Sequence, residues 1–85
     1  MQIEKLIEEM RNNPKNVRFE KLSALLLACG FTLKGGKGSH RVYIKSGMSE
    51  IVNIQNVSGK VKPYQVKQVL RIINKYSLLD GDTSE

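Results

Sequence analysis

Apolar residues near the N-terminus are spaced as on one side of a helix. They occupy positions i, i+3, i+4 and i+7: Ile3, Leu6, Ile7 and Met10. We therefore expect a first helix over residues 2–12. Asn13-Pro14 ends it, because a proline disfavours helical backbone in the residue before it.

A second helix is predicted from about Asn16, whose side chain can cap the first turn. Gly30 ends it, because glycine takes the left-handed conformation at the position after a helix at little cost. Phe31 then folds back onto Leu26. The buried face of this helix contains Phe19, Leu22, Leu25, Leu26 and Cys29.

A third helix is predicted to begin at Pro63, since the first helical position needs no N–H donor. Its apolar residues again repeat at helical spacing: Val66, Val69, Leu70 and Ile73. Residues 80–85 are expected to form a flexible tail.

Between the second and third helices the apolar period changes to two, which predicts strands. We expect strands over residues 31–34 and 40–45 and a third beginning at Ile51, with Ser46-Gly47 as a tight hairpin turn. In each strand two alternating sets face opposite ways: Phe31 and Leu33 against Thr32 and Lys34, Val42 and Ile44 against Arg41 and Tyr43, and Val52 and Ile54 against Ile51 and Asn53.

The predicted order is helix, helix, three-stranded meander, helix. A three-stranded antiparallel sheet needs one face covered, and the second and third helices have the apolar stripes to cover it. The fold class is therefore α+β, a two-layer α/β sandwich. A chain of 85 residues is expected to form a single domain, residues 1–85.

The chain carries 14 Lys and Arg against 8 Asp and Glu, a net charge of +6. Between residues 32 and 76 there are nine basic residues and one acid, Glu50, which gives that segment +8. This asymmetry favours a polyanionic partner such as RNA, although an acidic protein would also fit.

Several function classes are disfavoured by composition. One cysteine allows no internal disulfide, and no cluster of Cys and His has the spacing of a zinc site. With Glu50 alone in the basic segment, we expect no divalent metal and no other cofactor. No apolar run approaches the roughly 20 residues that span a bilayer, and the N-terminus lacks a signal-peptide core. We expect a cytoplasmic protein that binds neither membrane nor small-molecule ligand.

His40, the one histidine, stands where a glycine-rich loop becomes a strand. An imidazole has an ordinary pKa of about 6.5 and can exchange a proton near neutral pH. The bare backbone of the loop at residues 35–38 lets a phosphate approach its N–H groups. His40 is therefore the candidate general base, able to take a proton from a ribose 2′-hydroxyl in RNA.

Basic residues around this loop and ahead of the last helix are candidate phosphate contacts. Lys60 and Lys62 precede a helix N-terminus, which favours anions. Tyr43 and Tyr64 could stack on bases, whereas Cys29 is expected to be a core residue. The predicted RNA-binding residues are Lys37, Gly38, Ser39, Arg41, Lys60, Lys62 and Lys67.

Over residues 16–79 the sequence resembles the HicA family of bacterial toxins. The resemblance rests on Leu26 to Phe31, on Gly38-Ser39-His40 and on the segment from Val61 to Val69. It implies a double-stranded-RNA-binding-like fold, α-β-β-β-α, to which residues 2–12 add a helix. That helix buries its apolar stripe against the domain or against a partner.

The resemblance also implies a function, that of a messenger-RNA endoribonuclease with His40 as catalytic residue. The expected partners are messenger RNA and a HicB-type antitoxin protein. Many members carry a second histidine after the third strand, whereas this chain has Gln55-Asn56-Val57. The general acid is then a lysine, Ser39, water or His40 itself. Two other functions fit the same residues: a non-catalytic module that binds duplex RNA, and a domain that docks an acidic protein.

Overall fold

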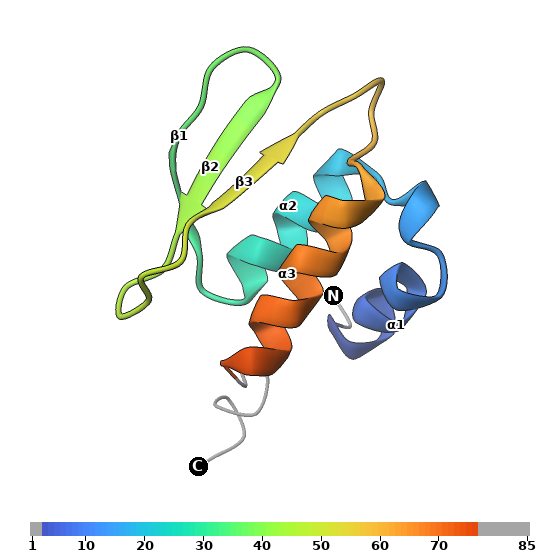
Figure 1. Cartoon of the computed structure of the whole chain (residues 1–85), viewed down its shortest axis with the longest axis horizontal. Helices are drawn as coiled ribbons and strands as arrows, with labels where there is room; N and C mark the ends of the chain where they lie inside the picture. Colours follow the sequence, from blue (N-terminus) through green and yellow to red (C-terminus); the bar gives the residue numbers. More distant parts are fainter. Residues whose placement is uncertain (1–2, 77–85) are drawn as a thin grey trace.

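The computed structural model describes residues 3–76, which contain three α-helices and a three-stranded sheet with the helices on one side of it (Figure 1). A short 3-10 helix, Pro14–Asn16, joins the first two helices. The elements are α1 (Ile3–Asn12), α2 (Phe19–Ala28), β1 (Thr32–Gly35), β2 (His40–Ile44), β3 (Val52–Gln55) and α3 (Pro63–Lys75). The α+β class and the α-β-β-β-α order of the predicted core are confirmed. The predicted tail, residues 80–85, lies outside the described residues.

The sheet is antiparallel, with strand order β1-β2-β3. Helices α2 and α3 both lie on one of its faces (Figure 1). A sheet with helices on one face alone buries alternate residues of each strand and leaves the others toward solvent. Which residues point inward is therefore decided by the register between strands.

The inner face of the sheet carries Tyr43, which belongs to the set that alternates with Val42 and Ile44. Tyr43 is paired with Val52, which is fully buried, and is itself only 3% exposed. Its hydroxyl forms a hydrogen bond with Ser23 of α2. Val42 and Ile44 point the other way and are half-buried. The predicted alternation is confirmed. Because both sets are partly apolar, the alternation alone does not decide which set faces the helices.

Helix α2 begins at Phe19, three residues later than predicted, and its N-cap is Arg18, not Asn16. The reason is Val17, which has extended backbone, is buried and accepts a hydrogen bond from the Val61 N–H at 3.1 Å. A helix starting at Asn16 would break this pairing. Phe19 is only half-buried as a result, although it still packs against the core.

The end of α2 is as predicted. Gly30 has a φ of +97°, and its N–H bonds the Leu27 carbonyl while the Phe31 N–H bonds the Leu26 carbonyl. These two bonds are those of a Schellman motif, in which a left-handed residue after the helix satisfies its last carbonyls. Phe31 is 2% exposed and closes this end of the core.

The connections around β2 are less regular than predicted. Ser46-Gly47 does form a turn, with Met48 N–H bonded to Lys45 O at 3.1 Å and Gly47 at a φ of +87°. However, β3 starts only at Val52, so the turn is not a tight hairpin. On the other side of β2, an irregularity after Leu33 disturbs the pairing with β1, and Leu33 is 52% exposed.

Helix α1 buries its apolar stripe within this chain. It packs against α2, α3 and the 3-10 helix. Leu6, Ile7 and Met10 are all less than 10% exposed and belong to the same core cluster as the sheet residues. The sequence left open whether this stripe is buried against the domain or against a partner. In the described residues it is buried against the domain. No helix within residues 3–76 has the length and apolar character to cross a membrane.

Helix α3 presents a broader buried face than the predicted stripe. Leu70 is only half-buried, whereas Ile72 is 1% exposed. The helix contacts α1 as well as the sheet side of the molecule, so more of its circumference is covered. Its buried residues are Gln65, Val66, Val69, Ile72 and Ile73.

We expect Met10→Ala to lower the free energy of unfolding by about 2 to 5 kcal/mol, because it removes a buried side chain and leaves a cavity. Leu27→Ala is the matched control, since Leu27 is a helical residue that is 52% exposed. Its effect should stay within about 0.5 kcal/mol. Urea denaturation followed by circular dichroism measures both. Equal effects of the two changes would show that α1 is not part of the folded core.

Candidate nucleic-acid interface

His40 is the first residue of β2 and is exposed to solvent. It lies on the sheet face opposite to Tyr43, because three positions separate the two residues along the strand. Its Nδ1 is 3.4 Å from the Asn53 Oδ1 on β3. Asn53 is paired with Val42, so His40 and Asn53 are diagonal neighbours on the outer face. The histidine is thus open to a ligand and oriented by an amide.

The loop before His40 is closed by a turn. His40 N–H bonds Lys37 O at 3.1 Å, and Gly38 has a φ of +65°. A Cβ on Gly36 would lie 2.3 Å from the His40 carbonyl oxygen, so only glycine fits there. Gly35, by contrast, has open space around it. The glycine run therefore has one position of close backbone approach and one left-handed position.

Arg41 holds this turn from within. Its Nη1 donates to the carbonyl oxygens of Gly38 at 2.9 Å and His40 at 2.8 Å. Ser39 O in turn accepts a hydrogen bond from Asn56 N–H at 2.9 Å. The predicted residues Lys37, Gly38, Ser39, His40 and Arg41 thus form one turn and the first two positions of β2, and Arg41 has a structural role that the sequence did not indicate.

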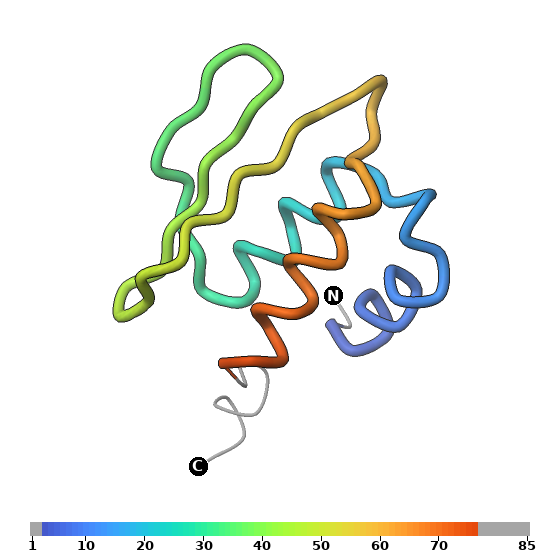
Figure 2. Tube along the Cα trace, viewed as in Figure 1, coloured from blue at the N-terminus to red at the C-terminus, as the bar shows by residue number. Residues whose placement is uncertain are grey.

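Lys60 and Lys62 lie in the connection from β3 to α3. Val57 and Lys60 exchange two backbone hydrogen bonds, at 2.7 and 3.0 Å, around a turn whose Gly59 N–H bonds the Asn56 Oδ1. Asn56 therefore joins this turn to the loop before His40. Figure 2 shows both turns at the same end of the molecule. The two lysines are exposed, while Val61 between them is 4% exposed.

Gln65 is a site residue that the sequence reasoning missed. It lies in the first turn of α3, is 5% exposed, and bonds the backbone of β3 twice: Oε1 accepts from Gln55 N–H at 3.2 Å and Nε2 donates to Asn53 O at 3.4 Å. Gln55 is the cross-strand partner of His40. The side chain thus pairs with the edge strand as a neighbouring strand would. Its position one turn before Val69 on the apolar stripe was the available signal.

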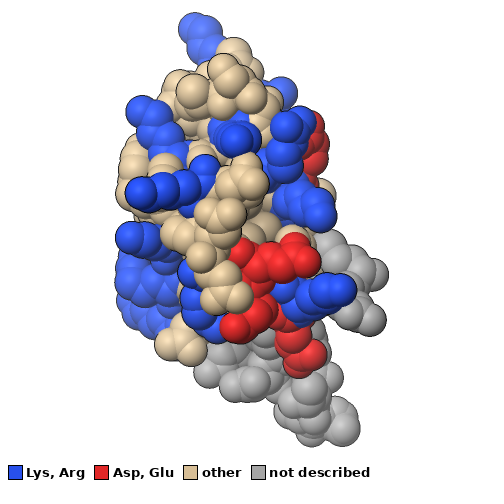
Figure 3. All heavy atoms as spheres, turned by 90° about the vertical axis from the view of Figure 1, so that its right-hand side faces the viewer, with Lys and Arg blue, Asp and Glu red and all other residues tan. Residues whose placement is uncertain are grey.

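Lys67 lies in a different place from the other predicted contacts. Together with Arg71 it lines an open hollow of about 440 Å³ between α3 and the N-terminal segment. The remaining lining residues are Met10, Arg11, Pro14, Leu70 and Asn74. Figure 3 shows lysines and arginines spread over much of the helical side, with acidic residues in its lower middle and at its upper right edge. None of the contacts described for residues 3–76 joins Lys67 to His40.

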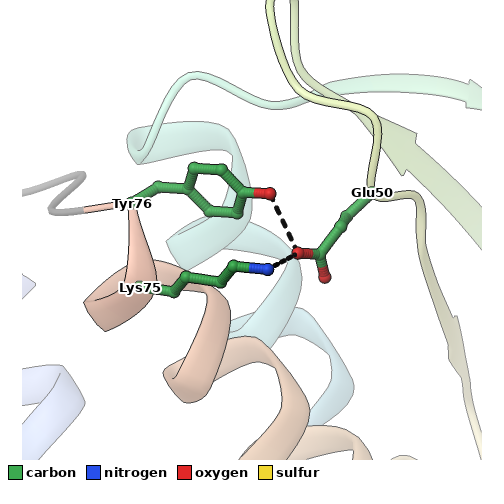
Figure 4. Close-up of polar contacts among 3 residues, drawn as sticks. All are labelled: Glu50, Lys75 and Tyr76. Atoms are coloured by element: carbon green, nitrogen blue, oxygen red, sulfur yellow. Dashed lines mark hydrogen bonds and ion pairs between the residues drawn. The ribbon is translucent and has the colours of Figure 1, made fainter.

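Glu50, the one acid of the basic segment, is bound at the other end of the sheet. One carboxylate oxygen accepts hydrogen bonds from Lys75 Nζ at 2.8 Å and from the Tyr76 hydroxyl at 2.9 Å (Figure 4). These two bonds, Lys75 first, lower the pKa of Glu50, and the bond to Glu50 raises the pKa of Lys75. Within residues 3–76, no three His, Cys, Asp or Glu side chains gather as a metal site would require.

The predicted aromatic and cysteine residues differ in their exposure to solvent. Tyr43 is buried, so its predicted stacking on a base is wrong, because the inner face of the sheet holds it against α2. Tyr64 is 63% exposed on α3. Cys29 is 7% exposed, in keeping with the predicted core position.

The site thus defines a small basic α+β protein with one exposed histidine at a glycine turn. A family model described as HicA toxin of bacterial toxin-antitoxin matches residues 19–74, more than half of the 85 residues. The chain therefore belongs to the HicA toxin family and is a toxin of a toxin-antitoxin system, with an antitoxin as partner. Searches of curated proteins and of solved structures give no match. Helix α1 and the 3-10 helix precede the matched segment.

We expect Gly36→Ala to destabilise the protein by about 1 to 3 kcal/mol, because the added methyl group overlaps the His40 carbonyl. The matched control is Gly35→Ala, which meets nothing within 4 Å. The control should leave stability unchanged or slightly higher. Urea denaturation gives the free energies, and amide NMR shifts of residues 37–41 report the turn. If Gly36→Ala left both unchanged, the close backbone approach would be refuted.

The contact of Glu50 predicts a pH-dependent contribution to stability. Because the folded pKa of Glu50 is lowered from about 4.5, the carboxylate stabilises the fold above that pH and loses this effect as the pH falls through the folded value. Glu50→Gln should therefore unfold at a modestly lower temperature than the wild type at pH 7. The difference should shrink below pH 4. Calorimetric scans from pH 3 to 7 measure it, and a difference independent of pH would contradict this account.

Proposed function

We propose that this toxin is an endoribonuclease that cleaves messenger RNA without a metal ion, with His40 as general base. The observation that carries the proposal is the placement of His40: exposed, at a glycine turn, and with Nδ1 facing the Asn53 Oδ1. When the amide oxygen accepts a hydrogen bond, Nδ1 carries the proton. The neutral ring then keeps a lone pair on Nε2, the nitrogen available to a substrate.

In the proposed reaction, Nε2 removes the proton of a ribose 2′-hydroxyl. The 2′-oxygen forms a bond to the adjacent phosphorus while the bond from phosphorus to the 5′-oxygen breaks, which leaves a 2′,3′-cyclic phosphate. The 5′-oxygen takes a proton from a lysine, from Ser39, from water or from the His40 imidazolium. General-base catalysis by a positioned histidine contributes about 10² to 10⁴ in rate.

The RNA backbone is held from two directions. Lys37 with the backbone of Gly38 and Ser39 contacts phosphate from the turn, and Lys60 and Lys62 contact it from the start of α3. Arg41 uses Nη1 to hold the turn, and because a guanidinium carries five N–H donors it can face a phosphate as well. Lys67, on the helical side, contacts a more distant part of the strand.

The same surface accounts for inhibition by an antitoxin. The described residues of the turn and of the start of α3 include no acidic side chain, so an acidic face of a HicB-type antitoxin suits them. Such a partner would cover His40 and the phosphate contacts together. We expect both proteins to act in the cytoplasm, where messenger RNA is translated.

We expect His40→Ala to lower the cleavage rate of labelled RNA by about 10² to 10⁴ in the presence of a chelator. Affinity for RNA should change by less than about threefold, because the phosphate contacts are cationic side chains elsewhere. A substrate with a 2′-deoxy sugar at the cleaved position should resist cleavage. Gel analysis of the products and fluorescence anisotropy give the two quantities.

The wild type and a surface control, Lys21→Ala, are assayed alongside. Cleavage that needs magnesium, or that survives in His40→Ala, contradicts the mechanism. If the wild type binds RNA but never cleaves it, the protein is a binding module. If it does not bind RNA and binds an acidic protein, the basic surface serves docking instead.

A further inference from the structure

The exposed ring of Tyr64 has no structural task comparable to those of the other two tyrosines. Tyr43 is buried and bonded to Ser23, and the Tyr76 hydroxyl bonds Glu50. Tyr64 lies in the first turn of α3 and is 63% exposed, the most exposed large apolar side chain among residues 3–76. A single exposed apolar side chain is ordinary on a protein surface. Tyr64 is distinguished by the exposed lysines that precede it and by its place next to Gln65.

Two exposed lysines, Lys60 and Lys62, precede this ring in the sequence. Lys62 has extended backbone, with φ −75° and ψ 147°, and Val61 before it is 4% exposed. In an extended segment alternate side chains face opposite ways, so Lys60 and Lys62 both point out while Val61 points in. Tyr64 comes two residues after Lys62, as the second residue of α3, and is exposed as well. A ring beside cations combines stacking with attraction to phosphate, as in proteins that bind single strands.

The start of α3 is tied to the strand that faces His40. Gln65, the residue after Tyr64, bonds Gln55 N–H and Asn53 O through its side-chain amide. Gln55 is paired with His40, and Asn53 contacts the imidazole. The ring therefore lies in a helical turn that the Gln65 side chain fixes relative to the strand beside His40, which suits a contact that positions substrate.

We propose that Tyr64 is a nucleobase-binding site, whose ring stacks on a base of the RNA held by Lys60 and Lys62. This inference rests on the proposed RNA-cleaving function and adds a substrate class. Bases inside a duplex are stacked on both faces by their neighbours, so a base that reaches an exposed tyrosine is unpaired. The substrate is then single-stranded RNA, or RNA with a loop or bulge at this point.

The test measures binding in the His40→Ala background, which keeps the RNA intact. Tyr64→Leu should weaken binding of a 12-nucleotide oligoadenylate by about 5- to 150-fold, the cost of one lost base stack. Tyr64→Phe should bind as the parent does, because it keeps the ring. Leu27→Ala, an exposed apolar residue of α2, is the matched control and should have no effect. Circular dichroism verifies that each variant is folded.

A fluorescent variant shows whether the base itself is contacted. The chain has no tryptophan, so Tyr64→Trp introduces a single indole. Oligoadenylate should quench its fluorescence, while an oligomer of the same sugar-phosphate backbone without bases should bind more weakly and leave the emission unchanged. A fully paired duplex should behave like the abasic oligomer.

The inference is overturned if Tyr64→Leu binds oligoadenylate as tightly as Tyr64→Phe, or if the abasic oligomer or the duplex quenches the indole equally. In those cases RNA binding by the parent persists, and the proposed function stands without it. Failure of every variant, the parent included, to bind any RNA would instead remove the proposed function itself.

Discussion

Burial of one face of a small sheet is the constraint on which the rest of this structure depends. Tyr43, Val52 and Ile54 point toward α2 and α3 and are nearly inaccessible to water. Because side chains alternate along a strand, a shift of one position would move this apolar set to the solvent side. The same alternation puts His40 and Asn53 on the outer face. The same pairing between strands therefore decides both which residues pack in the core and that His40 is exposed.

Side-chain amides then join the parts that the core leaves separate. The Gln65 side chain connects α3 to the edge strand β3, and that of Asn53 connects this strand to His40. Asn56 accepts from the Gly59 N–H with its side chain and donates its backbone N–H to Ser39 in the loop before His40. Amides suit this purpose because each can donate and accept without adding charge. A carboxylate in their place would weaken the positive field that a polyanion requires.

The distribution of charge follows from the fold as much as from composition. Glu50 is close in sequence to β3, yet the connection that contains it carries it to the end of α3, where Lys75 and Tyr76 bind it. The acids of α1 lie on the helical side, where Lys67 and Arg71 also line a hollow. The glycine turn and the start of α3 therefore carry cationic but no acidic side chains.

Local patterns by themselves determined the helices, the number of strands, the Schellman end of α2 and the glycine turn beside His40, because spacing, capping and backbone freedom act within a few residues. They also carried the motifs of the HicA family. Only tertiary structure decided that Tyr43 and not Val42 faces the core, that α2 starts at Phe19, and that Lys67 lies apart from His40. Each of these depends on contacts between residues far apart in the chain, such as Tyr43 with Ser23 or Val17 with Val61, and no local periodicity contains them.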